Sequence, residues 1–215
     1  MGDKKLQGMD SFDEINKSLG PDHYAMQRDS QDILFTIGRR TQGWFPKELS
    51  QSLKDKHIDW MWSLTEWLDE WKRLAVNDEM DDGGRILAYA NLGALVESWL
   101  KLFLLCHIRS YDEDPCKRKN GTIIKPKDIK FENLIEFFYK IWDIDEGLSD
   151  EYNEFAKKYP EWAKRVQHRR NILHIFTNSE LGTNSEFLED LEFYYILIDE
   201  IATRIPLPEY SLLSE

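Results

Sequence analysis

The segment between Arg85 and Ile108 constrains the fold of this chain more than any other feature, because its apolar residues surround the helical axis. A surface helix keeps such residues on one face. Here they recur on every side: Ile86, Leu87, Leu92, Leu95, Val96, Trp99, Leu100, Phe103 and Leu104. A helix of this kind needs neighbours all round, so the pattern predicts the central helix of an all-α bundle. The charged Glu97 and Lys101 favour a buried helix over a membrane span.

Segments with apolar residues on a single helical face predict the helices that pack around the central one. From about Pro46 to Val76, apolar residues recur at three- and four-residue steps, and the run Asp81–Gly84 (Asp-Asp-Gly-Gly) is expected to end that unit. This spacing predicts packing for every tryptophan of the segment except Trp62, so a base-stacking platform is disfavoured there. Asp128 is expected to cap a further helix.

The carboxyl-terminal third is also expected to be helical. Ser149 is expected to cap a short helical segment interrupted by Pro160, and a new helix is expected from about Pro160 through Phe176. The run Thr183–Glu186 matches a capping box ahead of a last amphipathic helix, which Pro206 would stop. The sum is a bundle of about five to six helices, with a small β-hairpin expected near residues 116–125 at an Asn-Gly turn.

Length and composition favour one main core. The chain has 215 residues, of which 41% are hydrophobic and 13% aromatic, which is ample material for one interior. We expect residues 1–45 to be an amino-terminal arm with a short extended segment at 32–38, and residues 46–208 to be a single helical domain. Its two cysteines, Cys106 and Cys116, form no zinc-like or CxxC spacing. No metal and no cofactor are expected. The absence of a signal-peptide pattern at the start favours a cytoplasmic protein.

Positive charge is concentrated in two segments of an acidic chain. The net charge is −12, which argues against a protein that coats nucleic acid. Residues 157–174 contain six Lys or Arg and one acid, and residues 117–130 again contain six and one. Each segment therefore carries +5, and the rest of the chain carries −22. Such a cationic locus can select a local anion without binding polyanions indiscriminately.

The run Gln167–His174 (Gln-His-Arg-Arg-Asn-Ile-Leu-His) offers the most distinctive chemistry of the chain. An imidazole can move a proton near neutral pH, and a guanidinium can hold a phosphate with its planar fork. On a continuous helix Arg169 would lie in the packed stripe, with Arg170 and His174 on its flank and Asn171 nearly opposite. A buried unpaired guanidinium is costly, so Arg169 must meet a carboxylate, a cleft or a second subunit.

The run Arg169–His174 resembles the Arg-x4-6-His motif of the HEPN superfamily of helical RNases and toxin components. The run Leu95–Lys101 (Leu-Val-Glu-Ser-Trp-Leu-Lys) is similar to the glutamate-then-lysine pattern on a leading helix of that fold, and the likeness covers roughly residues 85–205. Arg170 is followed by asparagine, as in many members, whereas Arg169 has their spacing to His174. Both arginines therefore remain candidates for the functional arginine. Phe176 stands where a toxin subgroup has a tyrosine that its antitoxin modifies.

The resemblance implies metal-independent cleavage of RNA. His174 would assist proton transfer as a 2′-hydroxyl attacks phosphorus, and Arg169 or Arg170 would stabilise the phosphate charge. Asn171 would contact the phosphate or orient the imidazole, while Lys164, Arg165 and the 117–130 segment would add phosphate contacts. Members usually join two motif helices across a homodimer, and toxin members have a cognate antitoxin protein.

Two other interpretations of the same residues stay open. The fold could serve a non-catalytic module that binds a protein or nucleotide partner. Alternatively, Arg169 could belong to a buried ion-pair network in a purely structural domain. Glu97 has a corresponding ambiguity, because it can pair with Lys101 on its own helix or act as the buried partner of Arg169.

Overall fold

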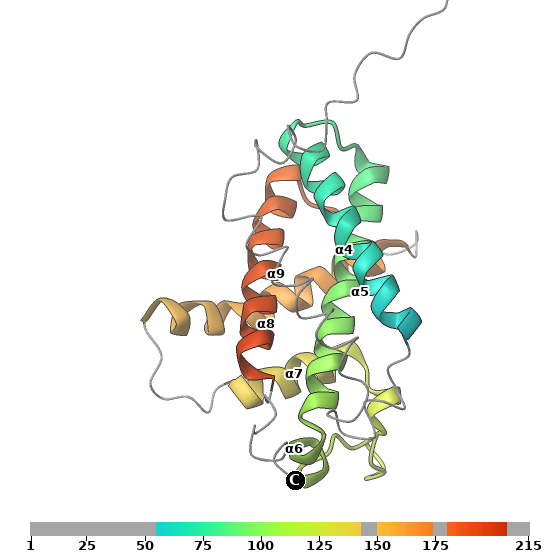
Figure 1. Cartoon of the computed structure of the whole chain (residues 1–215), viewed down its shortest axis with the longest axis vertical. Coiled ribbons are helices and arrows are strands. Elements are labelled where there is room, and N and C mark those ends of the chain that lie inside the picture. Colours follow the sequence, from blue (N-terminus) through green and yellow to red (C-terminus); the bar gives the residue numbers. More distant parts are fainter. Residues whose placement is uncertain (1–54, 143–149, 174–179, 206–215) are drawn as a thin grey trace, which may run out of the picture.

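The computed structural model describes residues 55–142, 150–173 and 180–205, and within these ranges it is an all-α bundle of six α-helices (Figure 1). The expectations for the arm at 1–45, for the extended segment at 32–38, for Pro46 and for Pro206 lie outside the described residues, as does His174. The elements are α4 (Asp55–Val76), α5 (Asp82–Cys106), α6 (Ile108–Glu113), η1 (Pro126–Asp128), α7 (Phe131–Trp142), α8 (Asp150–Arg170), η2 (Asn171–Leu173) and α9 (Asn184–Arg204).

Helix α5 is the central helix, as its all-round apolar pattern predicted. It contacts α4, α6, α7, α8 and α9 as well as the short η1 and η2. Figure 1 shows it running down through the bundle, with α4 crossing it and α9 to its left. It is long and apolar enough to cross a membrane, but 61% of its most apolar stretch is buried among the other helices. Most of this stretch therefore packs in the core.

The start of α5 corrects one prediction. The run Asp81–Gly84 does not simply end the preceding unit, because the Asp81 carboxylate caps α5 by accepting a hydrogen bond of 2.7 Å from Gly84 N. An aspartate before the first helical residue satisfies a backbone N–H that has no partner within the helix. The two glycines therefore belong to the first turn of α5.

Helix α4 packs through a narrower stripe than its periodicity suggested. Met61 and Leu68 are buried, and Thr65 between them donates to the Met61 carbonyl. Trp60 and Trp67 flank this stripe and are 58% and 57% exposed. The prediction that both tryptophans pack in the core was wrong. The face of α4 that contacts α5 and α9 is formed by the neighbouring Met61 and Leu68.

The structure of residues 110–130 differs from two predictions, the β-hairpin and the helix cap at Asp128. The Asn120–Gly121 turn forms, with Gly121 at φ +80°, but its arms share a single antiparallel bridge between Lys117 and Ile123 in place of a hairpin ladder. Asp128 ends η1 and does not cap α7, whose first hydrogen bond runs from Leu134 N to the Lys130 carbonyl.

Helix α8 corrects two boundaries. It is continuous from Asp150 through Pro160 to Arg170, so no break precedes the Arg/His run. The predicted cap, Ser149, lies outside the described residues. The helix loses one backbone hydrogen bond at Pro160, while its buried side chains Tyr159, Trp162 and Val166 hold it against the bundle. The α-helix then ends at Arg170, earlier than predicted, and continues as η2.

The Thr183–Glu186 capping box of α9 is confirmed. Thr183 Oγ1 accepts from Glu186 N, and Glu186 Oε2 accepts from Thr183 N at 2.7 Å. This box fixes Glu186 at the start of α9, facing the end of α8.

Candidate functional site

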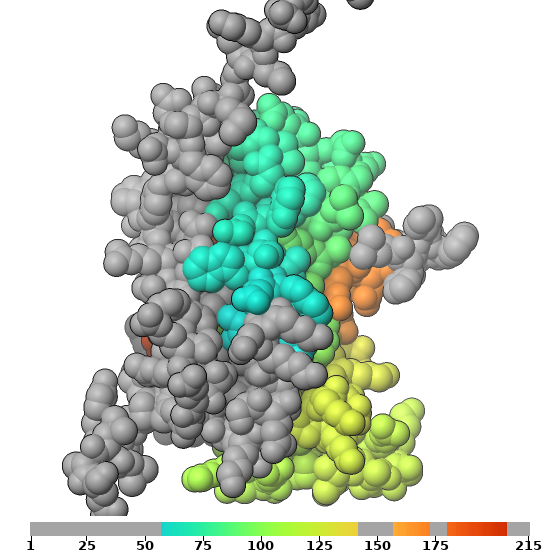
Figure 2. All heavy atoms as spheres, turned by 45° about the vertical axis from the view of Figure 1, so that its right-hand side comes forward, coloured from blue at the N-terminus to red at the C-terminus, as the bar shows by residue number. Residues whose placement is uncertain are grey.

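The end of α8 brings two adjacent arginines against α5 and α9. Figure 2 shows the orange atoms of this part of α8 above the yellow atoms of the segment around α7, on one face of the molecule. Arg169 turns inward toward α9, and Arg170 lies over α5. Their surroundings differ in burial, in hydrogen-bond partners and in the number of donors left over.

Arg169 is the buried arginine and is only 6% exposed. Its Nη1 donates to the Tyr89 hydroxyl at 2.6 Å and to Asp190 Oδ2 at 3.0 Å. Its Nη2 donates to Glu186 Oε1 at 2.9 Å. The guanidinium also lies over the Tyr89 ring, 5.0 Å from its centroid. Of the three kinds of partner expected for a buried Arg169, which were a carboxylate, a cleft and a second subunit, the structure shows carboxylates.

Asp190 is the centre of this network. It is fully buried, and it accepts hydrogen bonds from three side chains: Tyr89 at 2.9 Å, Arg169 at 3.0 Å and Arg165 at 2.6 Å. The carboxylate is therefore fully engaged within the bundle. Arg165, predicted to contact phosphate, is instead held by Asp190, although its side chain remains 42% exposed.

The pKa values of the network keep its charges in place. Burial and the nearby Asp190 raise the pKa of Tyr89 well above its usual value, so the hydroxyl stays protonated and can donate. Burial disfavours the charged form of Arg169, but its contacts with Tyr89, Glu186 and Asp190 outweigh this and raise its pKa. Hydrogen bonds from Thr183 N and Arg169 lower the pKa of Glu186.

Gly182 lies directly against the guanidinium of Arg169. It has φ +80°, a region that favours glycine, and a Cβ there would lie 2.6 Å from the Arg169 Cζ. The backbone before α9 therefore covers the guanidinium directly. The described structure leaves no room at Arg169 for a phosphate.

Arg170 has a more open environment. Its side chain is 32% exposed, and its Nη1 donates to Glu97 Oε2 of α5. Glu97 Oε1 accepts from Lys101 Nζ at 2.5 Å, so the intrahelical pair is present. Glu97 pairs with Arg170 and not with Arg169. Burial opposes the charge of Glu97, but hydrogen bonds from Lys101 and Arg170 outweigh it and lower its pKa.

Gly93 allows this close approach of α8 to α5. A Cβ at Gly93 would lie 2.6 Å from Arg170 Cδ and 2.7 Å from Arg170 Cβ. Since Cβ is fixed to the backbone, any larger residue would push α8 away. Arg170, Glu97 and Lys101 together carry one net positive charge at a partly exposed surface.

The remaining predicted site residues are distributed as follows. Lys164 and Asn171 are exposed, and His174 lies outside the described residues. The structure therefore brings Glu97 and Arg170 together, and it joins Arg165 and Arg169 in a second cluster. Among the described residues, no group of three or more His, Cys, Asp or Glu side chains could hold a metal ion.

Sequence reasoning missed Asp190, Tyr89, Gly182 and Gly93. A signal for Asp190 was available, because on α9 it falls between the buried Phe187, Leu191 and Tyr194. An acid inside an apolar stripe calls for a buried partner, as did Arg169 on α8. The two glycines gave no comparable signal.

No protein-family model, no curated protein and no solved structure matches this chain.

Proposed function

We propose that this chain is a metal-independent endoribonuclease of the HEPN type, acting in a toxin or defence setting in the cytoplasm, with Arg170 as its phosphate-binding arginine. We choose Arg170 over Arg169 because the two side chains differ in burial and in the number of their hydrogen-bond partners. Arg169 is buried and bound on both of its terminal nitrogens, whereas Arg170 is partly exposed and has one carboxylate partner. Arg169 is then a structural residue that fixes the end of α8.

In the proposed reaction the 2′-hydroxyl of a ribose attacks the adjacent phosphorus. The new O2′–P bond forms as the P–O5′ bond breaks, which gives a 2′,3′-cyclic phosphate and a 5′-hydroxyl. His174, which follows Arg170 with three residues between them, takes the proton of the 2′-hydroxyl, and a proton is passed to the 5′-oxygen as it leaves. Arg170 stabilises the added charge on the phosphate oxygens, and Glu97 restricts the guanidinium to one orientation. The cationic Lys164 and the exposed Asn171 supply contacts nearby.

The resemblance supports two further parts of the proposal. A homodimer would place two such segments together, and a cognate antitoxin protein would restrain the activity. Phe176 lacks the hydroxyl that the nucleotidyl-modified toxin subgroup uses, so restraint would come through binding.

The deciding experiment is RNA cleavage in EDTA with four variants. His174→Ala and Arg170→Ala should each lower the cleavage rate by about 100-fold or more, because they remove a proton-transfer group and a charge-stabilising donor. The matched controls are His168→Ala and Arg109→Ala, which replace exposed residues of the same types. Intact RNA with the unaltered protein, or equal cleavage by His174→Ala, would reject the proposal.

A second candidate is a non-catalytic module that binds a protein or nucleotide partner. The specific observation in its favour is that both arginines already have carboxylate partners. In that case the unaltered protein leaves every RNA intact in the assay above. Binding of the partner would then depend on Arg170 and would be unaffected by His174→Ala.

A further inference from the structure

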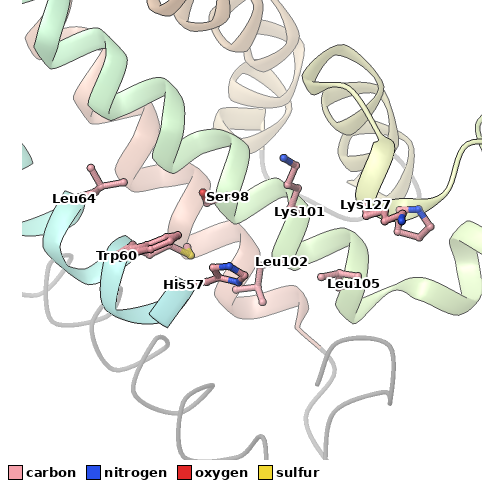
Figure 3. A pocket seen from close by; sticks show the side chains of 10 residues that line it. His57, Trp60, Leu64, Ser98, Lys101, Leu102, Leu105 and Lys127 are labelled. Atoms are coloured by element: carbon pink, nitrogen blue, oxygen red, sulfur yellow. The ribbon is translucent and has the colours of Figure 1, made fainter. Parts of the chain in front are cut away.

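A pocket of about 360 Å³ lies between α4, α5 and η1, next to the candidate site. This volume falls in the lower part of the range of roughly 300–1,000 Å³ that small-molecule sites occupy. Figure 3 shows Trp60 and His57 on one side, Lys127 on the opposite side, and side chains of α5 between them. The lining is His57, Trp60, Met61, Leu64, Ser98, Lys101, Leu102, Leu105, Pro126 and Lys127.

The two charged side chains that line this pocket are both lysines. Lys101 and Lys127 are lysines on different elements, and no Asp or Glu is among the described lining residues. The chain as a whole carries a net charge of −12, so a pocket with only basic charges stands apart from its surroundings. Such a setting favours an anionic ligand.

The pocket also offers an aromatic surface. Trp60 is 58% exposed, and its ring lies 5.5 Å from the His57 ring, tilted by 51°. The part of α5 that lines the pocket is apolar at Leu102, which is buried, and at Leu105, which is half-buried. A ligand that suits this lining has a flat ring and an acidic group.

Lys101 connects the pocket to the candidate site. Its Nζ bonds to Glu97 Oε1 at 2.5 Å, and the other oxygen of Glu97 accepts from Arg170. The lysine side chain is 42% exposed, so it has donors for a second partner. In addition, η1 and η2 both contact α5. Basic groups therefore follow α5 from Arg170 through Lys101 to Lys127.

We propose that this pocket binds one nucleotide of a single-stranded RNA, next to the phosphate that Arg170 contacts. The base stacks on Trp60, and the phosphate of that nucleotide lies between Lys101 and Lys127. The inference rests on the proposed nuclease function for its substrate. It adds a contact that selects unpaired RNA, because a base within a duplex cannot stack on a protein ring.

The test is the binding of a short 2′-O-methyl oligoribonucleotide, followed by fluorescence anisotropy. This strand lacks the attacking hydroxyl, so binding is measured whether or not the protein cleaves RNA. Trp60→Leu should weaken binding about tenfold, as expected for loss of one stacked base. Lys127→Ala should weaken it severalfold and lower the salt dependence of the binding constant by about one ion.

Matched controls separate this site from general surface effects. Trp67→Leu changes an equally exposed tryptophan of α4 that lies outside the pocket, and Arg109→Ala removes an exposed positive charge that lies outside the pocket and outside both cationic segments. Both should bind like the unaltered protein, and the melting temperatures of the two tryptophan variants should agree. Equal binding by Trp60→Leu and Trp67→Leu would overturn the pocket proposal even if the protein cleaves RNA. Trp60-dependent binding without cleavage would support the pocket and reject only the nuclease.

Discussion

At the scale of single residues, two adjacent arginines of α8 have separate tasks. Arg169 is a buried member of a cluster in which two arginines meet two carboxylates and a tyrosine hydroxyl. Arg170 extends over Gly93 to a glutamate of α5 and keeps contact with solvent. The first arrangement stabilises the fold, and the second is compatible with an anionic ligand.

Asp190→Asn should lower the free energy of unfolding by about 3 kcal/mol, because breaking a buried ion pair leaves uncompensated charge in the interior. Arg165, Arg169 and Tyr89 would all lose a charged acceptor while the shape of the side chain stays the same. Urea unfolding measures the change. The control is Glu189→Gln, an exposed neighbour on the same helix, for which a change within about 0.5 kcal/mol is expected. Similar stabilities of the two variants would contradict the network.

At the scale of helices, the approach of α8 to α5 depends on one missing side chain. Gly93 lies in the buried middle of α5, where Arg170 crosses. Glycine within a helix normally lowers stability relative to alanine. At this position the close packing compensates for that cost.

Gly93→Ala should therefore destabilise the protein by about 1–3 kcal/mol, because the new Cβ would overlap Arg170 Cβ and Cδ and α8 would have to shift. The matched control is Gly83→Ala in the first turn of the same helix. Its Cβ would meet only Asp81 Oδ1 at 3.5 Å, an ordinary contact. That variant should be stabilised by about 0.5–1 kcal/mol. Thermal unfolding of both proteins gives the comparison, and a shift of the same sign in both would refute the argument.

Helix patterns in the sequence predicted the central position of α5, the capping box of α9 and the all-α class, since each depends on local spacing. The extent of α8 was predicted less well, because the helix continues through Pro160 and gives way to η2 after Arg170. The pairing of Arg169 with Asp190 joins residues from two helices. Each was marked as a charge in an apolar stripe, but which acid met which arginine required the three-dimensional arrangement.

Across the whole bundle, His107 connects three helices, α5, α6 and α9. It follows the last residue of α5 and precedes α6, and its Nε2–H donates to the Arg204 carbonyl at the end of α9 at 3.0 Å. Its ring packs against Phe103 with a centroid distance of 4.3 Å. Burial lowers the pKa of this histidine below its ordinary value of 6.5, despite the hydrogen bond to Arg204.

Acid should consequently destabilise the fold in two stages. Below about pH 6.5 the unfolded chain takes up a proton at residue 107 that the folded chain excludes, so stability is lost as the pH falls toward the lowered folded pKa. Below pH 4.5 the lowered pKa values of Glu97 and Glu186 produce a second loss in the same direction. Urea unfolding from pH 8 to about pH 2.5 measures both stages, because the second loss extends down through the lowered pKa values of the two glutamates. His107→Gln, which keeps a donor for Arg204, should reduce the first stage and leave the second, whereas His168→Gln at an exposed position should change neither. An unchanged first stage in His107→Gln would show that this histidine does not couple proton uptake to unfolding.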